Sequence, residues 1–355
     1  LAAVTTASAT APTTTAWDPN AGQTVRSISR YKPTGTGSIF IGGDYVVLGG
    51  STRNHVAELK KDGTFTAWAP AGTDGPVRAL AATASTVYAG GEFSKSGTAN
   101  RANLAAFDTG AGAATTAWNP GTDGKVQALQ VAGGTVYIGG AFGQVGSVAR
   151  NKVAAVDTTG VVTGWNPNIT GTLVRAIAVD GATAYVGGAF TAVGSAARSN
   201  VAAIDTTSGN AINTWNPGTD GPVYAIALNS ATVYLGGKFA SVAGVARSNA
   251  AGVSRADGSA TDWAPEADDT VRTLAVLGSK VFAGGDFTTI GGAARPFAAQ
   301  LFDDTGLATD GFTPALSGRV YAISVGTSSS VGFFGSFTSA NSPAVATNSY
   351  AFYGG

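Results

Sequence analysis

The chain repeats itself about every 49 residues, and this period constrains its fold more than any other feature. Tryptophan recurs at spacings of 47 to 51 residues, each time followed two residues later by proline, and an F-T-P sequence takes the same place near the carboxyl end. Self-similarity at a fixed period of about 20–50 residues is typical of solenoids, propellers and repeat arrays. The seven marker positions are Trp17, Trp68, Trp118, Trp165, Trp215, Trp263 and Phe312.

A second marker keeps the same period. The strand-like phrase TVYIGGAF, residues 135–142, returns as TVYAGGEF, TAYVGGAF, TVYLGGKF and KVFAGGDF. Glycine inside a strand marks a bulge or a close backbone approach. We predict that the missing side chains form a shallow slot in which a tryptophan such as Trp118 lies flat on bare backbone. The first glycine of each pair is assigned to Gly49, Gly90, Gly139, Gly187, Gly236 and Gly284, and the last copy has a lone Gly335.

Each repeat contains four short apolar segments separated by turns rich in Gly, Asn and Asp, with no helical period. Four strands in roughly 40–50 residues are typical of a propeller blade. We therefore predict an all-β protein, a single seven-bladed β-propeller with four antiparallel strands per blade. The predicted blades are residues 24–70, 77–120, 126–167, 174–217, 223–265, 271–314 and 320–354.

The two ends of the chain predict how the ring closes. The last repeat stops one strand short, and the sequence TTTAWDP, residues 13–19, stands alone before the first repeat. We predict that this segment completes the last blade and leaves no open sheet edge. Residues 1–12 are Thr- and Ala-rich, and we interpret them as a flexible segment of a processed, exported chain or of a fragment.

The composition argues against several classes of protein. Charged residues make up 12% of the chain and balance at 21 basic against 21 acidic, which is unlike a nucleic-acid-binding surface. No apolar run is long enough for a transmembrane helix. Cysteine is absent, so the chain has no thiolate metal site. We expect no nucleic-acid partner, no membrane span and no cofactor.

One long phrase carries a family resemblance. The sequence WNPGTDGPVYAIALNSATVYLGGKFASVAGVARSNAAG, residues 215–252, resembles the delta-60-type propeller repeats of secreted and cell-surface bacterial proteins, notably actinobacterial ones. It is also distantly similar to the ectodomains of fungal cortical markers. The resemblance extends over residues 13–355 and implies a propeller in an extracellular or cell-surface location. It implies no catalytic residues, because the function of that family is largely undefined.

Residues with catalytic or metal-binding chemistry are sparse. The single histidine, His55, aligns with asparagines in other repeats, so we interpret it as a hydrogen-bonding loop residue. Arginine recurs two residues before that position, and we expect it to clamp neighbouring loops through Asp or carbonyl groups. Aspartates recur after the W-x-P phrase, where G-T-D-G is good turn chemistry. Four of them are weak metal candidates, because one carboxylate per loop falls short of a calcium site: Asp74, Asp123, Asp220 and Asp269.

A ligand site is expected where the repeats differ from one another. Two positions vary, the second residue of the innermost strand and the residue between the glycine pair and the following Phe. We predict that both lie around the central opening and form an axial funnel for an anionic or polyhydroxylated ligand. The candidate ligand-binding residues are Arg26, Arg78, Gln127, Arg175, Tyr224, Arg272 and Tyr321 from the first position, with Glu92, Lys238 and Asp286 from the second.

These observations favour an extracellular, non-catalytic module that binds a glycan or a protein and serves in adhesion. The alternative is a structural subunit that self-associates into a surface layer or an extracellular filament. A carboxylate-dependent hydrolase or lyase is a third interpretation, for which Glu92 and Asp286 are the carboxylates to test.

Overall fold

The computed structural model describes residues 23–31, 38–60, 65–114, 117–326, 331–340, 345–346 and 350–353. Over these ranges the chain forms strands, turns and loops without a helix, which confirms the all-β prediction. No helix in this part of the chain could span a membrane. The predicted closing segment 13–19, with Trp17, and the amino-terminal segment 1–12 lie outside the described residues.

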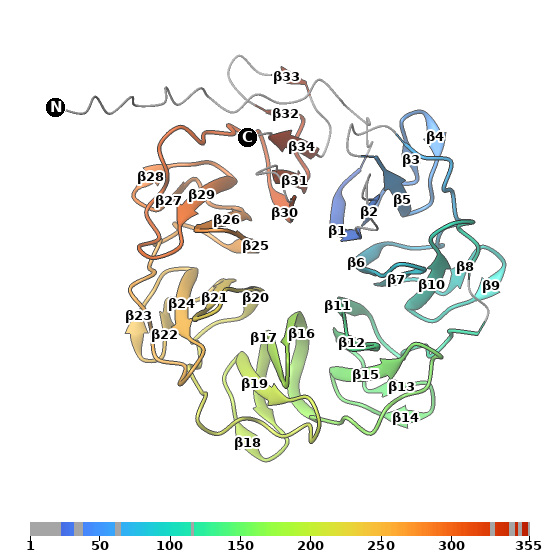
Figure 1. Ribbon diagram of the computed structural model, residues 1–355, viewed down its shortest axis with the longest axis horizontal. Coiled ribbons are helices and arrows are strands. Elements are labelled where there is room, and N and C mark those ends of the chain that lie inside the picture. Colours follow the sequence, from blue (N-terminus) through green and yellow to red (C-terminus); the bar gives the residue numbers. More distant parts are fainter. Residues whose placement is uncertain are drawn as a thin grey trace.

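Within the described ranges, seven main sheets are arranged around a central opening, with the first strand of each nearest that opening (Figure 1). Each sheet consists of three antiparallel strands, to which the fourth sheet adds a short one. In chain order, these main strands are β1 (Val25–Tyr31), β2 (Ser38–Gly43) and β5 (Val56–Leu59); β6 (Val77–Ala82), β7 (Thr86–Gly91) and β10 (Leu104–Asp108); β11 (Val126–Ala132), β12 (Thr135–Gly140) and β15 (Val153–Asp157); β16 (Ile169–Asp180), β17 (Thr183–Val193) and β19 (Val201–Asp205); β20 (Val223–Leu228), β21 (Thr232–Gly237) and β24 (Ala250–Ser254); β25 (Val271–Leu277), β26 (Lys280–Gly285) and β29 (Ala298–Phe302); and β30 (Val320–Val325), β31 (Val331–Gly335) and β34 (Tyr350–Tyr353).

The loop between the second and third main strands is more ordered than predicted, because it folds into a two-residue-per-strand hairpin. These hairpins are β3 (Val47–Leu48) with β4 (Ser51–Thr52), β8 (Lys95–Ser96) with β9 (Ala99–Asn100), β13 (Gln144–Val145) with β14 (Val148–Ala149), β18 (Ala196–Ala197) with the end of β17, β22 (Ser241–Val242) with β23 (Val245–Ala246), β27 (Thr289–Ile290) with β28 (Ala293–Ala294), and β32 (Ser339–Ala340) with β33 (Val345–Ala346).

The prediction of four regular strands per blade is wrong for the described repeats. The fourth segment is reduced to one isolated bridge, as between Val156 and Val162 or between Ile204 and Ala211. The W-x-P phrase follows within a few residues, and its proline cannot donate a hydrogen bond to a ladder. The chain therefore leaves the sheet after a single pairing and crosses to the next repeat.

The structure corrects the assignment of the first glycine pair and confirms the lone Gly335 of the last copy. Gly43 pairs with Val25 as Gly91 pairs with Val77, so Gly42 and Gly43, not Gly49, are the glycine pair of the first repeat. Gly49 lies in the hairpin turn at positive φ. In the last repeat, Phe334 takes the place of the first glycine of the pair, because Gly335 pairs with Val320.

The predicted tryptophan slot at the paired glycines is wrong. The space beside these glycines is filled by the next sheet and by the adjoining strand. A Cβ atom on Gly139 would lie 2.6 Å from Cγ1 of Val174, which belongs to the first strand of the next sheet. A Cβ atom on Gly140 would lie 2.1 Å from the carbonyl oxygen of Lys125, the residue before the first strand of its own sheet. The first glycine therefore admits the neighbouring sheet and the second admits the adjoining strand, as expected for glycine at sites of close backbone approach.

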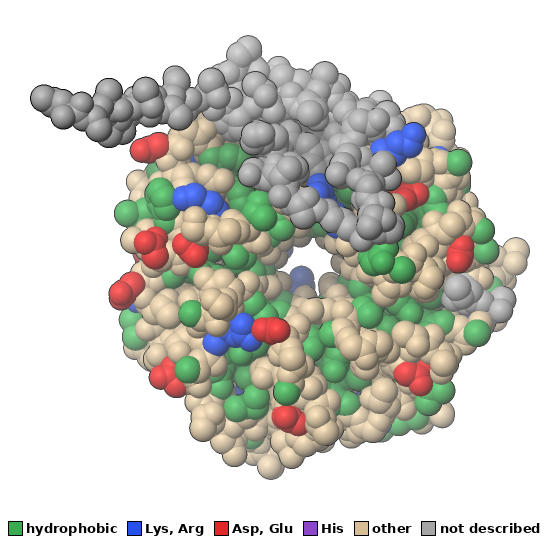
Figure 2. All heavy atoms as spheres, in the orientation of Figure 1, with side chains coloured by type: hydrophobic (Ala, Val, Ile, Leu, Met, Phe, Trp, Pro, Cys, Tyr) green, Lys and Arg blue, Asp and Glu red, His purple; other side chains and the backbone are tan. Residues whose placement is uncertain are grey.

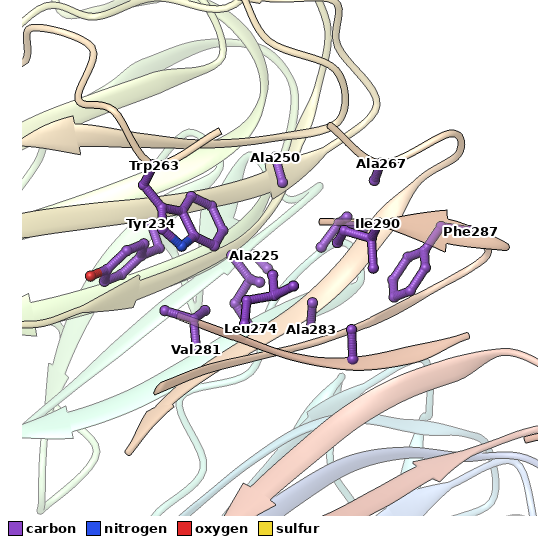
Figure 3. Close-up of a cluster of buried hydrophobic side chains, with 13 residues drawn as sticks. Ala225, Tyr234, Ala250, Trp263, Ala267, Leu274, Val281, Ala283, Phe287 and Ile290 are labelled. Carbon is purple, nitrogen blue, oxygen red and sulfur yellow. The ribbon is translucent and has the colours of Figure 1, made fainter. Parts of the chain in front are cut away.

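The five tryptophans among the described residues instead bridge consecutive sheets. Trp118 packs edge-on against Tyr88 of its own sheet, with ring centroids 4.9 Å apart. Its indole N–H donates a 3.0 Å hydrogen bond to the carbonyl of Asp157, at the end of the third strand of the next sheet. Figure 3 shows the equivalent cluster, in which Trp263 and Tyr234 cover apolar residues of the sixth sheet. The same donation links Trp68 to Asp108, Trp165 to Asp205, Trp215 to Ser254, and Trp263 to Phe302.

The close approach of neighbouring sheets yields a stability prediction. We expect Gly139→Ala to lower the free energy of unfolding by about 1–3 kcal/mol, because the new methyl group overpacks the contact with Val174. Gly164→Ala is the matched control, since nothing lies within 4 Å of its added Cβ, and we expect a change within about 0.5 kcal/mol. Denaturant unfolding of both variants measures the difference, and equal stability of the two would contradict the proposed contact.

Candidate functional site

A β-bulge directs one side chain per repeat toward the central opening. In all seven main sheets of the described chain, the register skips the residue after a buried valine of the first strand, for example between Val174 and Ala176. Bulges re-aim side chains in this way and are common beside functional sites. The skipped residues are Arg26, Arg78, Gln127, Arg175, Tyr224, Arg272 and Tyr321.

These seven side chains line one cavity of about 370 Å³, the axial cavity, together with Glu92 and Lys125. Figure 2 shows the central opening, with a basic side chain inside it. The structure thus brings together eight of the ten predicted ligand-binding residues. Lys238 and Asp286 do not line this cavity, although Asp286 contacts the lining residue Arg272. The sequence comparison missed Lys125, because it considered the second residue of the innermost strand, Gln127 in this repeat, and Lys125 lies two residues earlier.

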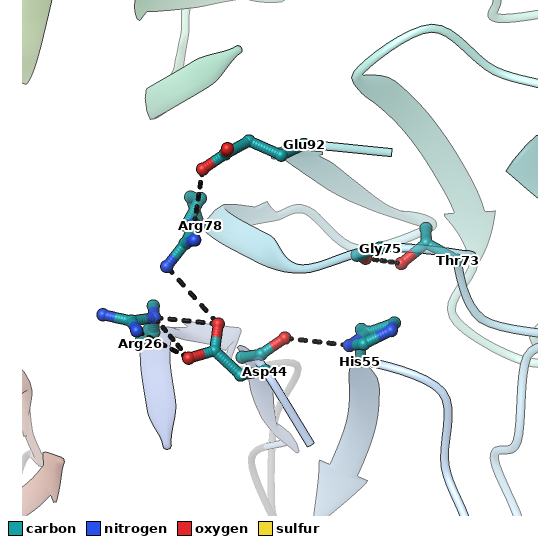
Figure 4. Close-up of polar contacts among 8 residues, drawn as sticks. Arg26, Asp44, His55, Thr73, Gly75, Arg78 and Glu92 are labelled. Atoms are coloured by element: carbon teal, nitrogen blue, oxygen red, sulfur yellow. Dashed lines mark hydrogen bonds and ion pairs between the residues drawn. The ribbon is translucent and has the colours of Figure 1, made fainter. Parts of the chain in front are cut away.

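Ion pairs hold the arginines of the first two repeats (Figure 4). Nε of Arg26 lies 2.8 Å from both carboxylate oxygens of Asp44. Arg78 bridges Asp44 at 3.3 Å and Glu92 at 3.0 Å. Desolvation disfavours the charged form of Arg26, but the hydrogen bond and negative charge of Asp44 outweigh it and raise the pKa of Arg26. Sequence reasoning missed Asp44 because it assigned the glycine pair of the first repeat to Gly49 instead of Gly42. The phrase SIFIGGDY, in which Asp44 follows a glycine pair, could have identified it.

A similar pair lies in the sixth repeat. Arg272 binds Asp286 through two hydrogen bonds, 2.7 Å from Nε and 2.5 Å from Nη2, and these raise its pKa. Arg319 also contacts Asp286, at 3.3 Å. The ring of Tyr321 lies between two guanidinium groups, 5.0 Å from that of Arg26 and 5.4 Å from that of Arg272. Such cation–π contacts fix the arginines at the cavity wall.

The recurring aspartates hold hairpins rather than gather around an ion. Oδ1 of Asp220 accepts the backbone N–H groups of Ala240 and Ser241 at 2.8 and 2.9 Å. Asp74 and Asp123 make the equivalent contacts. In the sixth repeat Asp268 does so, whereas Asp269 accepts the N–H of Thr270. No group of three or more His, Cys, Asp and Glu residues in the described chain could hold a metal ion.

The outer loops contain the remaining candidate residues. His55 adopts a left-handed backbone with φ 66°, as Asn103 and Asn200 do at 62° and 66°, and its Nδ1 lies 3.2 Å from the carbonyl of Gly43. Arg150 donates to two backbone carbonyls, those of Ala149 and Thr163. The clamp predicted for the recurring arginines is therefore of the carbonyl kind, and Arg198, Arg247 and Arg295 repeat it.

The axial cavity therefore offers guanidinium, amide and phenol groups that suit anions and hydroxyl groups. Guanidinium groups bind carboxylates and phosphates through paired hydrogen bonds. The carboxylates of Asp44, Glu92 and Asp286 are each held by at least one arginine.

Comparison with known proteins supports a β-propeller. Residues 34–65 match the family described as a domain of unknown function (DUF5122) beta-propeller, which supports a β-propeller repeat family. The crystal structure of the computationally designed Ika8 protein is similar over 96% of this chain and 100% of that chain, with a TM-score of 0.57 and 12% sequence identity. At this identity the likeness concerns the fold alone. The comparison with curated proteins found no match.

The hairpin aspartates yield a pH prediction. Although desolvation opposes ionisation, hydrogen bonds from Ala240 and Ser241 lower the pKa of Asp220. A lowered pKa contributes stability above the unfolded value of about 3.9, and this contribution is lost as the pH falls through the folded value. We therefore expect Asp220→Asn to reduce the loss of Tm between pH 5 and pH 3. The control is Asp262→Asn, at an exposed carboxylate that accepts no hydrogen bond from the described residues. Equal pH profiles for the two variants would contradict this role.

Proposed function

We propose that the protein is an extracellular or cell-surface, non-catalytic β-propeller that binds a glycan or a protein ligand in its axial cavity. The observation that supports this function is the convergence of seven bulged side chains of three kinds, Arg, Tyr and Gln, on one cavity. The packing of the sheets does not require different side chains at the bulge, because the buried strand residue beside each bulge is valine in every repeat. A position that changes while its backbone environment stays the same is available for recognition.

The size and chemistry of the cavity suit a small polar ligand or the end of a larger one. Its volume of about 370 Å³ lies within the range of roughly 300–1,000 Å³ that small-molecule sites occupy. A second hollow, lined by Asp74, Phe93 and Asp123 among others, shares Glu92 and Lys125 with it. A ligand in the axial cavity would therefore have room to extend outward between the second and third sheets.

We propose further that the repeats are of the delta-60 type and that the chain is an exported bacterial protein. The W-N-P phrase and the phrase with the glycine pair support this assignment, and the match of residues 34–65 to a beta-propeller family agrees with it.

The proposed architecture is a seven-bladed ring closed by residues 13–19. Packing between the two ends of the described repeats supports it: β1 packs against β30, and Val25 and Ile39 share a cluster with Ala322 and Phe334. By analogy with the other repeats, Trp17 would donate its indole N–H to the carbonyl of Lys60, the position equivalent to Asp108.

Two tryptophan variants test this closure. Trp215→Phe removes the hydrogen bond to the Ser254 carbonyl, which lies 2.8 Å from the indole nitrogen, and we expect a loss of about 1–3 kcal/mol in the free energy of unfolding. If Trp17 occupies the equivalent place, Trp17→Phe should cost a similar amount. A change within about 0.5 kcal/mol, as for an ordinary surface substitution, would rule out the proposed closure.

Binding to a glycan array and to extracellular matrix proteins tests the proposed function. We expect the wild-type protein to bind a defined set of ligands, and Gln127→Ala to weaken that binding up to about tenfold through lost hydrogen bonds. Gln144→Ala, at an exposed glutamine on the outer hairpin β13, should leave affinity unchanged.

Three outcomes would overturn the proposal. The first is that no ligand binds, and the second is that binding is indifferent to Gln127→Ala. The third is clear turnover of a glycoside or ester that Asp286→Asn or Glu92→Gln abolishes. Ordered assembly of concentrated protein in electron micrographs, without ligand binding, would favour a structural subunit instead.

A further inference from the structure

The axial arginines follow a pairing rule with one exception. In the first, second and sixth repeats, the residue after the glycine pair is an acid that binds the arginine of the same repeat. The pairs are Arg26 with Asp44, Arg78 with Glu92, and Arg272 with Asp286. In the fourth repeat the equivalent residues are Arg175 and Ala189, which stand at the same places in the strand register.

Arg175 therefore lacks a carboxylate partner among the described residues. It is exposed to the cavity, whereas the other three axial arginines are half-buried. Its guanidinium packs over the ring of Tyr224, 4.9 Å from the ring centroid. Stacking on an aromatic face leaves the edge of the guanidinium, with its N–H donors, available to a ligand.

The surroundings of Arg175 are positive on one side of the cavity. The residue after the glycine pair is Ala141 in the third repeat and Lys238 in the fifth, so neither neighbouring repeat supplies an acid at this position. Lys125 lines the same cavity. The side chain of Arg175 is accessible from the cavity, but the protein around it still desolvates the guanidinium, and this lowers the pKa of Arg175. Tyr224 acts in the opposite direction, and repulsion from the other axial arginines adds to the lowering. A bound anion would offset this repulsion.

The neutral groups beside Arg175 define the rest of the ligand. The bulge position holds Gln127 in the preceding repeat and Tyr224 in the following one, and both line the cavity. An amide and a phenol both donate and accept hydrogen bonds, as sugar hydroxyl groups require. A phosphate-rich ligand would favour several unpaired cations, whereas three of the four axial arginines are already paired with acids.

We propose that Arg175 is the anion-binding residue of the axial cavity and that the ligand is a carboxylated sugar of the uronic-acid class. The sugar carboxylate pairs with Arg175, and its hydroxyl groups lie within reach of Gln127 and Tyr224. This inference rests on the proposed function of the axial cavity as a binding site. It goes beyond that function because it names the class of ligand and the residue that selects it.

The missing partner of Arg175 provides the central test. Ala189→Asp installs the acid that the pairing rule lacks, without removing any residue that lines the cavity. We expect the new carboxylate to occupy Arg175 and to weaken the binding of D-glucuronate, measured by calorimetry in phosphate-free buffer, by about 10- to 100-fold. The Tm of this variant should stay equal or rise, because Arg175 gains a partner. Arg175→Gln should weaken binding to a similar extent.

Matched controls separate the charge of Arg175 from general effects. Arg319→Gln makes the same chemical change at an exposed residue that contacts Asp286 and does not line the cavity, so the affinity for D-glucuronate should be kept. D-glucose tests the sugar without the carboxylate, and sulfate tests an anion without the sugar. We expect both to bind more weakly than D-glucuronate.

The outcomes distinguish this inference from the function on which it rests. Unchanged D-glucuronate affinity in Ala189→Asp and Arg175→Gln overturns the role of Arg175. Sulfate binding as tight as that of D-glucuronate overturns the uronate assignment. If neutral glycans bind and depend on Gln127 but not on Arg175, the axial site stands and this inference fails. If no glycan or protein binds, the proposed function itself fails.

Discussion

Close contact between the glycines of one sheet and the valine of the next is the constraint on which the rest of the structure depends. A Cβ atom on Gly90, Gly187 or Gly236 would lie within 2.7 Å of a valine Cγ1 in the following sheet. Both faces of each sheet are thereby buried, and a single repeat cannot cover its own apolar faces. The hydrogen bond from each tryptophan of the described residues to the next sheet fixes the orientation of this packing, because it joins set positions on consecutive repeats.

The same packing explains why the cavity has a polar wall. The first strands converge toward the axis, and small residues such as Ala128 and Ala176 follow each bulge. These side chains leave the neighbouring strands close together. The long side chains at the bulges, such as Arg175, have room in the opening but not between the sheets. A repeated backbone feature thus collects seven independent side chains in one place, whatever their chemistry.

Charge in the cavity is distributed unevenly, although the chain as a whole is neutral. Acids neutralise the arginines of the first, second and sixth repeats, and tyrosine rings pack beside three guanidinium groups. The third and fourth repeats, which contribute Lys125 and Arg175 to the wall, have alanine rather than an acid at the position after the glycine pair. In a confined cavity such an imbalance acts over short distances with little screening, so it is a stronger source of selectivity than net charge.

The amino-acid sequence alone determined the all-β class, the repeat period and the seven residues that face the axis, because local strand and turn patterns recur with the period of the fold. Only the tertiary structure decided that Val174, and not Trp118, fills the space beside Gly139, since contacts between sheets leave no trace in the pattern of one strand. The same holds for Asp44, whose part in the cavity depends on a register that two glycine pairs in one repeat left ambiguous. It holds also for Arg175, because a missing partner is visible only once the other arginines are seen with theirs.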